Sequence, residues 1–228
     1  MVDYQCEIPL YDYQEPAVEA MAKVYCGILQ SPAGSGKTQM GIALAAKLGR
    51  KTLWLTHTKD LLSQSKRRAE QYMSPLLCGT ITEGRVSIGA GITFATVQTM
   101  SSLDLTQYRN VWDTIIVDEC HHVAAFTFET VLKAVEAKYV YGLSATPVRK
   151  DGHHTIIFMQ CGPVRYLVDA KSQAEKRSFS HIVIPRFTRM RLPNANGIQD
   201  MYAGVIENHN RNELLVSDAL KLVQEGRT

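Results

Sequence analysis

Short apolar runs and helical repeats follow one another along the first 150 residues of the chain. Residues 27–30 form a short run of strand character, and from Met40 to Leu48 the apolar side chains recur at helical spacing. Residues 112–117 form another run of strand character, which contains Asp113 and Thr114 and ends in three consecutive apolar residues. Consecutive apolar residues, in place of alternation, are typical of a parallel strand that is covered on both faces.

The polar loop between the first strand and its helix has the sequence SPAGSGKT, residues 31–38. Glycines in such a loop allow positive φ and a close approach of backbone N–H groups to phosphate oxygens, and the following helix N-terminus adds positive charge. Lys37 is expected to reach the β- and γ-phosphates and Thr38 to offer its hydroxyl to Mg²⁺. Ser31 departs from the strict pattern, which has glycine there. The predicted nucleotide-binding residues of the loop are Gly34, Ser35, Gly36, Lys37 and Thr38.

Two adjacent carboxylates, Asp118 and Glu119, follow the run 112–117. Open α/β sheets bind ligands at the carboxyl ends of their strands. The pair predicts a separate role for each carboxylate. Asp118 holds Mg²⁺, and Glu119 orients and deprotonates the attacking water. The alternative is a helix N-cap Asp with a first-turn Glu, because apolar residues from Phe128 to Val135 mark a helix just beyond.

The motifs around these two strings resemble those of superfamily II helicases and translocases. Asp118-Glu119-Cys120-His121 resembles a DExH box, and residues 144–146 resemble the Ser-Ala-Thr motif. Tyr13-Gln14, residues 53–64 and residues 94–99 resemble the Q motif, motif Ia and a nucleic-acid-contacting motif. The resemblance implies a RecA-like P-loop domain of the α/β class, a mostly parallel sheet with helices on both faces, and it implies ATP and Mg²⁺ as cofactors.

Within the superfamily, residues 144–152 followed by Gly162-Pro163 are most similar to the DNA-directed group of XPB repair helicases, phage recombination helicases and type III restriction motors. The XPB-like pattern carries Leu-Arg-x-Tyr-Gln ahead of the adenine, whereas here Leu10 is followed by Tyr11. Gln14 keeps the implied adenine contact. Tyr11 either stacks on the base or is a partly buried surface aromatic.

The resemblance also implies residues that couple nucleotide to nucleic acid. His121, Ser144 and Thr146 are the implied coupling residues between the ATP site and the nucleic-acid groove. The implied nucleic-acid contacts are Thr56, Gly79, Thr96 and Gln98.

Charge supports this interpretation only through its distribution. The net charge of +3 is too small to identify a nucleic-acid binder. Residues 47–68, however, carry seven basic side chains and one acidic one, around motif Ia. Such a cluster supplies a salt-sensitive background for phosphate contacts, or it is simply a solvated helix face.

Other features narrow the class of protein. The five cysteines never form a C-x-x-C pair, so we expect reduced thiols without a disulfide framework or zinc site. The adjacent pairs His121-His122 and His153-His154 lack the spacing of metal-binding histidines. No apolar run approaches the ~20 residues of a membrane helix, and the N-terminus has no secretory pattern. These features predict a cytosolic protein, nuclear in a eukaryote, with no membrane partner.

Residues 1–160 are predicted to form one RecA-like ATP-binding domain. Residues 161–228 are predicted to hold its remaining strands, at 162–168 and 181–185 around a polar helical stretch, a loop at 192–197, and a helix at 208–223 that leads toward a second RecA-like domain. No segment resembles the arginine-finger motifs of that second domain, which contribute about 10³ to 10⁵ in rate in phosphoryl-transfer enzymes.

We therefore expect the N-terminal motor domain of an ATP-dependent DNA helicase or translocase, nearly inactive without its second domain. DNA is favoured over RNA as the partner. Two alternatives remain open at this point, which are the motor part of a restriction or defence enzyme and a non-motor ATP-dependent nucleotide switch.

Overall fold

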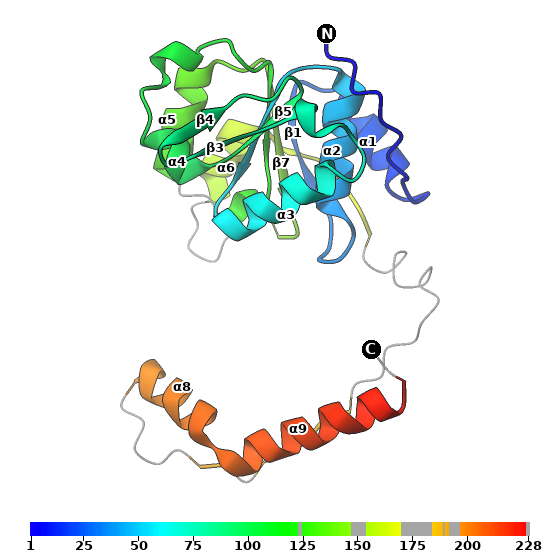
Figure 1. Cartoon of the computed structure of the whole chain (residues 1–228), viewed down its shortest axis with the longest axis vertical. Helices are drawn as coiled ribbons and strands as arrows, with labels where there is room; N and C mark the ends of the chain where they lie inside the picture. The colour runs from blue at the N-terminus through cyan, green and yellow to red at the C-terminus, as the bar shows by residue number, and fades with distance from the viewer. Residues whose placement is uncertain (123–124, 147–153, 170–183, 189, 192–196, 227–228) are drawn as a thin grey trace. The chain divides into compact units, whose positions relative to one another are not determined.

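A computed structural model of the chain describes residues 1–122, 125–146, 154–169, 184–188, 190–191 and 197–226. The chain forms two compact units, Met1–Arg177 and Ser178–Thr228 (Figure 1). The larger unit contains the phosphate loop and both carboxylates.

The larger unit is built on an eight-stranded sheet, as counted over the described residues, with the order β4-β3-β5-β2-β6-β7-β1-β8. Every neighbouring pair is parallel except β3 and β4, which form an antiparallel hairpin at one edge. The strands are β1 (Cys26–Gln30), β2 (Thr52–Thr56), β3 (Cys78–Thr82), β4 (Arg85–Ser87), β5 (Ile92–Thr96), β6 (Thr114–Val117), β7 (Tyr139–Ser144) and β8 (Val164–Leu167).

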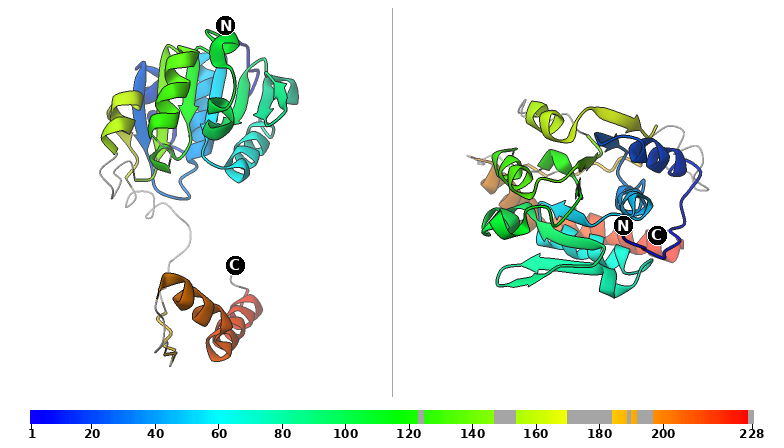
Figure 2. Two further views of the ribbon diagram at one scale, coloured as in Figure 1. Left: turned by 90° about the vertical axis from the view of Figure 1, so that its left-hand side faces the viewer. Right: turned by 90° about the horizontal axis from the view of Figure 1, so that it is seen from above.

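Helices cover both faces of this sheet (Figure 2). Helices α1 (Glu15–Ala22), α2 (Lys37–Leu48) and α3 (Lys59–Ala69) pack on one face, and α4 (Val97–Ser101), α5 (Ala125–Val135) and α6 (His154–Cys161) pack on the other. Short 3-10 turns lie at Pro75–Leu77, Leu105–Tyr108 and Cys120–His122.

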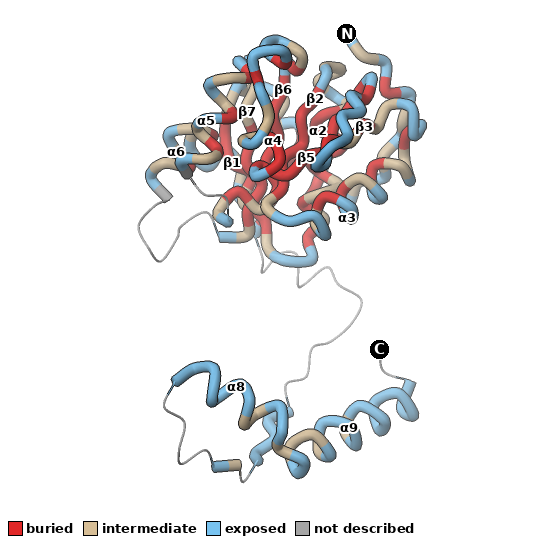
Figure 3. The backbone as a smooth tube through the Cα atoms, turned by 60° about the vertical axis from the view of Figure 1, so that its left-hand side comes forward, coloured by how far each residue is buried: buried red, intermediate tan, exposed pale blue. Residues whose placement is uncertain are grey.

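Successive strand residues feed two separate cores because side chains alternate across a strand. Leu29 belongs to the core under α1, α2 and α3, whereas its neighbour Ile28 belongs to the core under α4, α5 and α6. The same alternation separates Trp54 from Leu53 and Leu55. The buried strands therefore stand out as the central part of the unit in Figure 3. The predicted RecA-like α/β fold is confirmed.

In the larger unit, three of the predicted elements lie where they were expected and one strand is shorter than predicted. The strand at 27–30, the helix after the phosphate loop and the strand at 162–168 correspond to β1, α2 and β8. The run 112–117 forms a strand only from Thr114. Trp112 precedes the strand, is buried, and donates its indole N–H to Thr93 Oγ1 at 3.1 Å.

The smaller unit contains α8 (Ile198–Glu207) and α9 (His209–Gln224), which confirms the predicted helix at 208–223. Neither helix buries a residue within the described part of the chain, and Leu215 and Leu220 on the predicted apolar side are 51% and 58% exposed (Figure 3). The predicted strand at 181–185 falls mostly outside the described residues, and Ile184 and Pro185 have no regular structure. The predicted polar helical stretch before it also lies outside them, as do residues 192–196 of the predicted loop at 192–197 and residues 147–152 of the XPB-like pattern.

Among the residues that the structure describes, no helix is both long enough and apolar enough to cross a membrane.

Helix α2 lies so close to the sheet that Gly41 has no room for a side chain. A Cβ atom there would lie 2.6 Å from the Trp54 ring and 2.7 Å from Leu143 Cδ1, and both side chains are fully buried. Gly41 therefore sets the distance between the phosphate-loop helix and β2 and β7.

We predict that Gly41→Ala lowers the stability of the protein. Helix propensity alone favours Ala over Gly by about 1 kcal/mol, but overpacking costs about 1–3 kcal/mol where neighbours cannot move. Thermal unfolding followed by circular dichroism is expected to give a lower Tm, by roughly 2–4 °C per kcal/mol lost. Lys47→Ala on the exposed side of the same helix is the control. A Tm at or above the wild-type value would contradict the packing argument.

Candidate nucleotide-binding site

The phosphate loop joins β1 to α2 through two glycines with positive φ, Gly34 at 74° and Gly36 at 77°. Gly36 is the residue before the first turn of α2, in the left-handed conformation. A Cβ atom on Gly36 would also lie 2.5 Å from Gln14 Nε2. Conformation and space therefore both require glycine at this position.

Ser31 replaces the first glycine of the usual pattern and has a structural role of its own. Its hydroxyl is hydrogen-bonded to the Ser35 hydroxyl at 2.5 Å, and Ser35 donates in turn to the Pro32 carbonyl at 2.7 Å. Both serines are buried. The side chains of Ser31 and Ser35 thus stabilise the conformation of the loop through hydrogen bonds within it.

The ammonium group of Lys37 is buried inside the loop, with 7% of the residue exposed. It donates to the carbonyls of Ser31 and Pro32 at 3.3 and 3.4 Å, and it lies 3.4 Å from Glu119 Oε1. A buried cation that faces a loop of backbone N–H groups is the environment that phosphate oxygens need.

Asp118 follows β6 and is 3% exposed. Its Oδ2 accepts hydrogen bonds from Thr38 Oγ1 at 3.2 Å and from Ser65 Oγ at 3.3 Å, and its Oδ1 accepts from the Glu119 N–H at 3.1 Å. Burial, followed by the nearby Glu119 charge, raises the pKa of Asp118 to about 6, against the lowering effect of the Thr38 and Ser65 hydrogen bonds. A buried carboxylate beside a hydroxyl fits a hard cation such as Mg²⁺.

Glu119 lies between the phosphate loop and the DExH histidine. Its φ of 48° is in the left-handed region that residues other than glycine rarely adopt. Among the described residues its Oε2 is buried and accepts no hydrogen bond, although it lies 3.5 Å from His121 Nδ1. Strained backbone and an unpaired carboxylate oxygen are features that cluster at functional sites.

His121 is hydrogen-bonded to the Ser-Ala-Thr motif. Its Nδ1 lies 2.9 Å from Ser144 Oγ, which also accepts the backbone N–H of Thr146 at 3.1 Å. Burial, followed by the neighbouring His122, lowers the pKa of His121, which favours the neutral form of its ring. Ser144 reaches this position because β7 pairs with β6. Thr146 contributes its backbone to the contact, and the residue is exposed.

The Q-motif residues contact the phosphate loop at the Ser35 carbonyl. Gln14 is 1% exposed; its Nε2 donates to the Ser35 carbonyl at 2.8 Å and its Oε1 accepts from the Tyr11 N–H at 3.0 Å. Tyr13 also donates its hydroxyl to the Ser35 carbonyl, at 3.1 Å. Tyr11 is 67% exposed and stacks on Tyr13 with ring centroids 5.7 Å apart. The aromatic pair therefore extends from the loop toward solvent.

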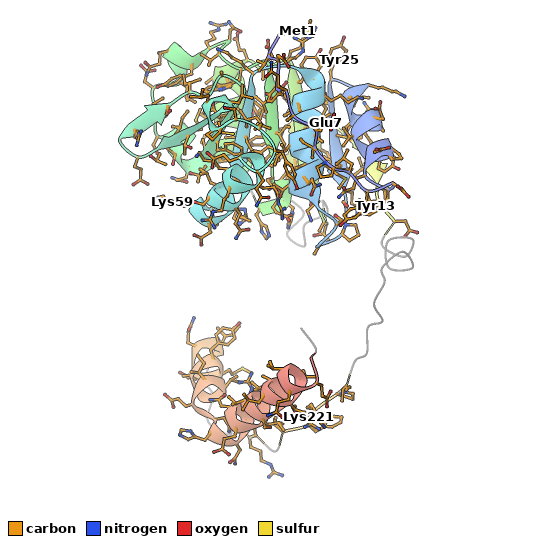
Figure 4. The ribbon with its side chains drawn as sticks, turned by 45° about the vertical axis from the view of Figure 1, so that its right-hand side comes forward. Met1, Glu7, Tyr13, Tyr25, Lys59 and Lys221 are labelled. Carbon is orange, nitrogen blue, oxygen red and sulfur yellow. The ribbon has the colours of Figure 1, made fainter. Side chains whose placement is uncertain are left out.

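The implied nucleic-acid residues are only partly brought together. Thr56 and Thr96 are register partners at the carboxyl ends of β2 and β5. Their hydroxyls bond within the protein, Thr56 to the Thr58 carbonyl at 3.0 Å and Thr96 to Thr99 Oγ1 at 2.9 Å. Gln98 is exposed on α4. In Figure 4, Lys59, which follows β2, and Tyr13 both lie at the lower edge of the larger unit.

Gly79 does not lie at this edge. It is the second residue of β3 and pairs with Thr93 near the start of β5. A Cβ atom on Gly79 would lie 2.0 Å from the Gly89 backbone nitrogen and 2.3 Å from the Ser87 carbonyl oxygen. The structure thus places Gly79 where glycine is needed for close backbone packing, away from the carboxyl ends of the strands.

Sequence reasoning missed Ser65, Tyr13 as a loop contact, and the imidazoles of His57 and His122. The His57 and His122 ring centroids lie 4.7 Å apart, and those of His121 and His122 lie 4.0 Å apart. The sequence did contain a signal for Ser65. Its spacing from Leu62 and Ala69 is helical, which places it on the buried side of α3 with these two apolar residues.

The fold and the site together define a RecA-like ATP-binding domain of the superfamily II helicase class. The chain belongs to the family described as the type III restriction enzyme res subunit, whose family model matches residues 7–149, more than half of its length.

Several named proteins are similar to this chain. A DNA 3'-5' translocase XPB2 of Sulfurisphaera tokodaii is 32% identical over 170 residues, covering 75% of this chain and 38% of that protein. A DNA 3'-5' helicase XPB of Mycobacterium tuberculosis is 30% identical over 171 residues, covering 69% and 30%. The chain thus spans about a third of the length of these relatives.

Solved structures share the fold. The UvsW helicase of bacteriophage T4 matches with a TM-score of 0.61 at 19% identity, covering 72% of this chain and 62% of that one. The Sulfolobus solfataricus SWI2/SNF2 ATPase core, solved in complex with double-stranded DNA, matches with a TM-score of 0.57 at 18% identity, covering 71% and 38%. The predicted superfamily and its XPB-like, type III restriction group are confirmed.

We predict that Asp118→Asn stabilises the protein above pH 6 and not near pH 4. The raised pKa means that the folded wild type binds more protons than the unfolded chain between about pH 4 and 6, so its stability falls as the pH rises through that window. The variant has no such proton. At pH 7 the free energy of unfolding of the variant is expected to exceed that of the wild type by an amount on the order of 1–3 kcal/mol, since one pKa unit corresponds to about 1.4 kcal/mol.

Denaturant unfolding of the nucleotide-free protein between pH 4.5 and 7.5 measures this difference. Asp113→Asn changes an exposed carboxyl just before β6 and serves as the control. A difference between variant and wild type that stays constant with pH would contradict the assignment of a raised pKa.

Proposed function

We propose that this chain is the ATP-binding motor domain of a DNA helicase or translocase. One observation carries the proposal, a continuous polar connection from the phosphate loop to the Ser-Ala-Thr motif. It runs from Lys37 to Glu119 at 3.4 Å, from Glu119 to His121 at 3.5 Å and from His121 to Ser144 at 2.9 Å. A group at the γ-phosphate position can therefore influence the motif that follows β7.

We assign ATP to the phosphate loop. The Gly34, Ser35 and Gly36 backbone and the Lys37 ammonium group bind the phosphates, while Gln14 and Tyr11 contact the adenine. The burial of Lys37 and the positive φ angles of the two glycines support this assignment. Family membership implies ATP use.

Thr38 and Asp118 are the residues that would hold Mg²⁺. The fit rests on the hydroxyl-to-carboxylate contact of 3.2 Å and on the burial of Asp118 without an ion-pair partner among the described residues. When bound, Mg²⁺ supplies positive charge that offsets the charge of the phosphates.

Glu119 accepts the proton of the attacking water. Its side chain lies beside Lys37, and its second oxygen accepts no hydrogen bond among the described residues, so it can bind a water molecule without losing an existing hydrogen bond. Neutral His121 then relays the state of Glu119 to Ser144, which fixes the start of the Ser-Ala-Thr loop through the Thr146 N–H.

DNA is the proposed partner, bound at the edge formed by Thr56, Thr96 and Gln98 and by the basic side chains of α3. The named relatives act on DNA, and one structural neighbour was solved with double-stranded DNA. These relatives are helicases and translocases, so neither the restriction-enzyme alternative nor the nucleotide-switch alternative is favoured. Efficient hydrolysis in this proposal requires a second RecA-like domain of the same protein to complete the site.

Lys37→Ala is expected to weaken ADP and ATP binding in the presence of Mg²⁺ by at least tenfold, because the variant loses the charge that faces the β- and γ-phosphates. Calorimetric titration of the chain measures the affinity. Lys47→Ala, a second lysine of α2 that pairs with Glu19 on the surface, is the matched control. Equal affinities for Lys37→Ala and wild type would contradict the assignment of the nucleotide to this loop.

Glu119→Gln is expected to keep nucleotide affinity and to lower hydrolysis by about 10²- to 10⁴-fold, because an amide cannot accept the proton of water. The measurement is steady-state phosphate release with DNA, in the protein that includes both RecA-like domains. Near-normal turnover in this variant would place the general base at another residue.

A further inference from the structure

Helix α3 contributes a residue to the site that none of the helicase motifs includes. Ser65 is 2% exposed and lies on the buried side of α3 with Leu62 and Ala69. A buried hydroxyl costs free energy unless it is hydrogen-bonded. Ser65 satisfies its hydroxyl by donating to Asp118 Oδ2 at 3.3 Å, across 53 positions of the chain.

The same carboxylate oxygen accepts the Thr38 hydroxyl at 3.2 Å. Asp118 is therefore held by three donors from three different elements, which are the start of α2, the middle of α3 and the backbone of Glu119. Thr38 also has to present its oxygen to Mg²⁺ in the proposed site. Ser65 has no such second task, so its donation to Asp118 is independent of the nucleotide.

These donors also fix the orientation of the Asp118 carboxylate, because between them they hold both of its oxygens. Removing the Ser65 hydroxyl leaves Thr38 as the one side-chain donor to Oδ2 among the described residues. The carboxylate is then held less firmly in the orientation that a cation at Asp118 and Thr38 would need.

We propose that Ser65 is a positioning residue for Mg²⁺-dependent nucleotide binding, acting through Asp118 Oδ2. This inference rests on the proposed function, since it assumes that Asp118 and Thr38 hold the metal. In this inference Ser65 holds Asp118 and is not itself a ligand of the metal. Its effect is confined to the part of the nucleotide affinity that depends on Mg²⁺.

The choice of variants follows from the space around Ser65. A pocket of about 320 Å³ between α2 and α3 is lined by residues that include Gly36, Thr38, Gln39, Ser65 and Arg68. Because water can enter a polar pocket of this size, a water molecule could replace the hydroxyl in Ser65→Ala. Ser65→Thr and Ser65→Val have equal size and differ only in the hydroxyl, so they form the decisive pair.

The experiment titrates ADP into the full chain, once with Mg²⁺ and once with EDTA. With Mg²⁺, Ser65→Val is expected to bind roughly tenfold more weakly than Ser65→Thr, the effect of one hydrogen bond to a charged group. With EDTA the two variants are expected to have equal affinities. Ser65→Cys, which adds no methyl group and has only a weak donor, is expected to behave as Ser65→Val does and covers the case in which the larger side chains disturb folding.

Ser63 provides the matched control on the same helix. Its hydroxyl is exposed and donates to the Lys59 carbonyl at 3.0 Å, so Ser63→Val and Ser63→Thr are expected to bind ADP alike under both conditions. Equal affinities of the Ser65 pair with Mg²⁺, or an equal loss with Mg²⁺ and with EDTA, would overturn the inference while leaving the proposed function intact. A wild-type chain whose ADP affinity does not respond to Mg²⁺ would overturn both.

Discussion

Burial of one carboxylate, that of Asp118, sets the arrangement of the whole site. A charge 3% exposed to solvent is stable only when hydrogen bonds replace its lost hydration. The donors come from the start of α2, from Ser65 on α3 and from the backbone of the following residue, so α2 and α3 must both approach the end of β6. The polar contacts of Asp118 thus link α2 and α3, which also share an apolar core.

The residue after this carboxylate shows what the arrangement costs. Glu119 adopts a φ of 48°, a conformation that costs of order 1–3 kcal/mol for residues other than glycine. With this backbone conformation, the side chain of Glu119 lies beside Lys37 and His121. A relaxed backbone at this position would carry the side chain onward with the chain, away from the phosphate loop. The left-handed backbone at Glu119 therefore goes together with a carboxylate that lies between Lys37 and His121.

Local chemistry explains which parts of this architecture could be predicted from the sequence. The phosphate loop depends on a strand, two glycines and a helix start that are adjacent in the chain, and the Asp118-Glu119 pair follows its own strand directly. By contrast, Gly79 is needed because the backbone of Gly89 packs directly against it, and no local sequence pattern encodes this contact. The hydrogen bond from Ser65 to Asp118 spans 53 positions, so it too follows from how α3 packs on the sheet and is not visible in any motif.

Strand β8 has a consequence for where shortened versions of this protein can end. It pairs with β1 on the side away from β7, and its flanks add hydrogen bonds from Ile28 N–H to the Pro163 carbonyl and from Val168 N–H to the Gln30 carbonyl. Removing the residues after 160 would turn the strand that leads into the phosphate loop into a sheet edge. An edge of unpaired N–H and C=O groups next to apolar side chains invites strand addition from a second molecule and aggregation. Truncation after residue 160 would therefore expose the strand that leads into the phosphate loop.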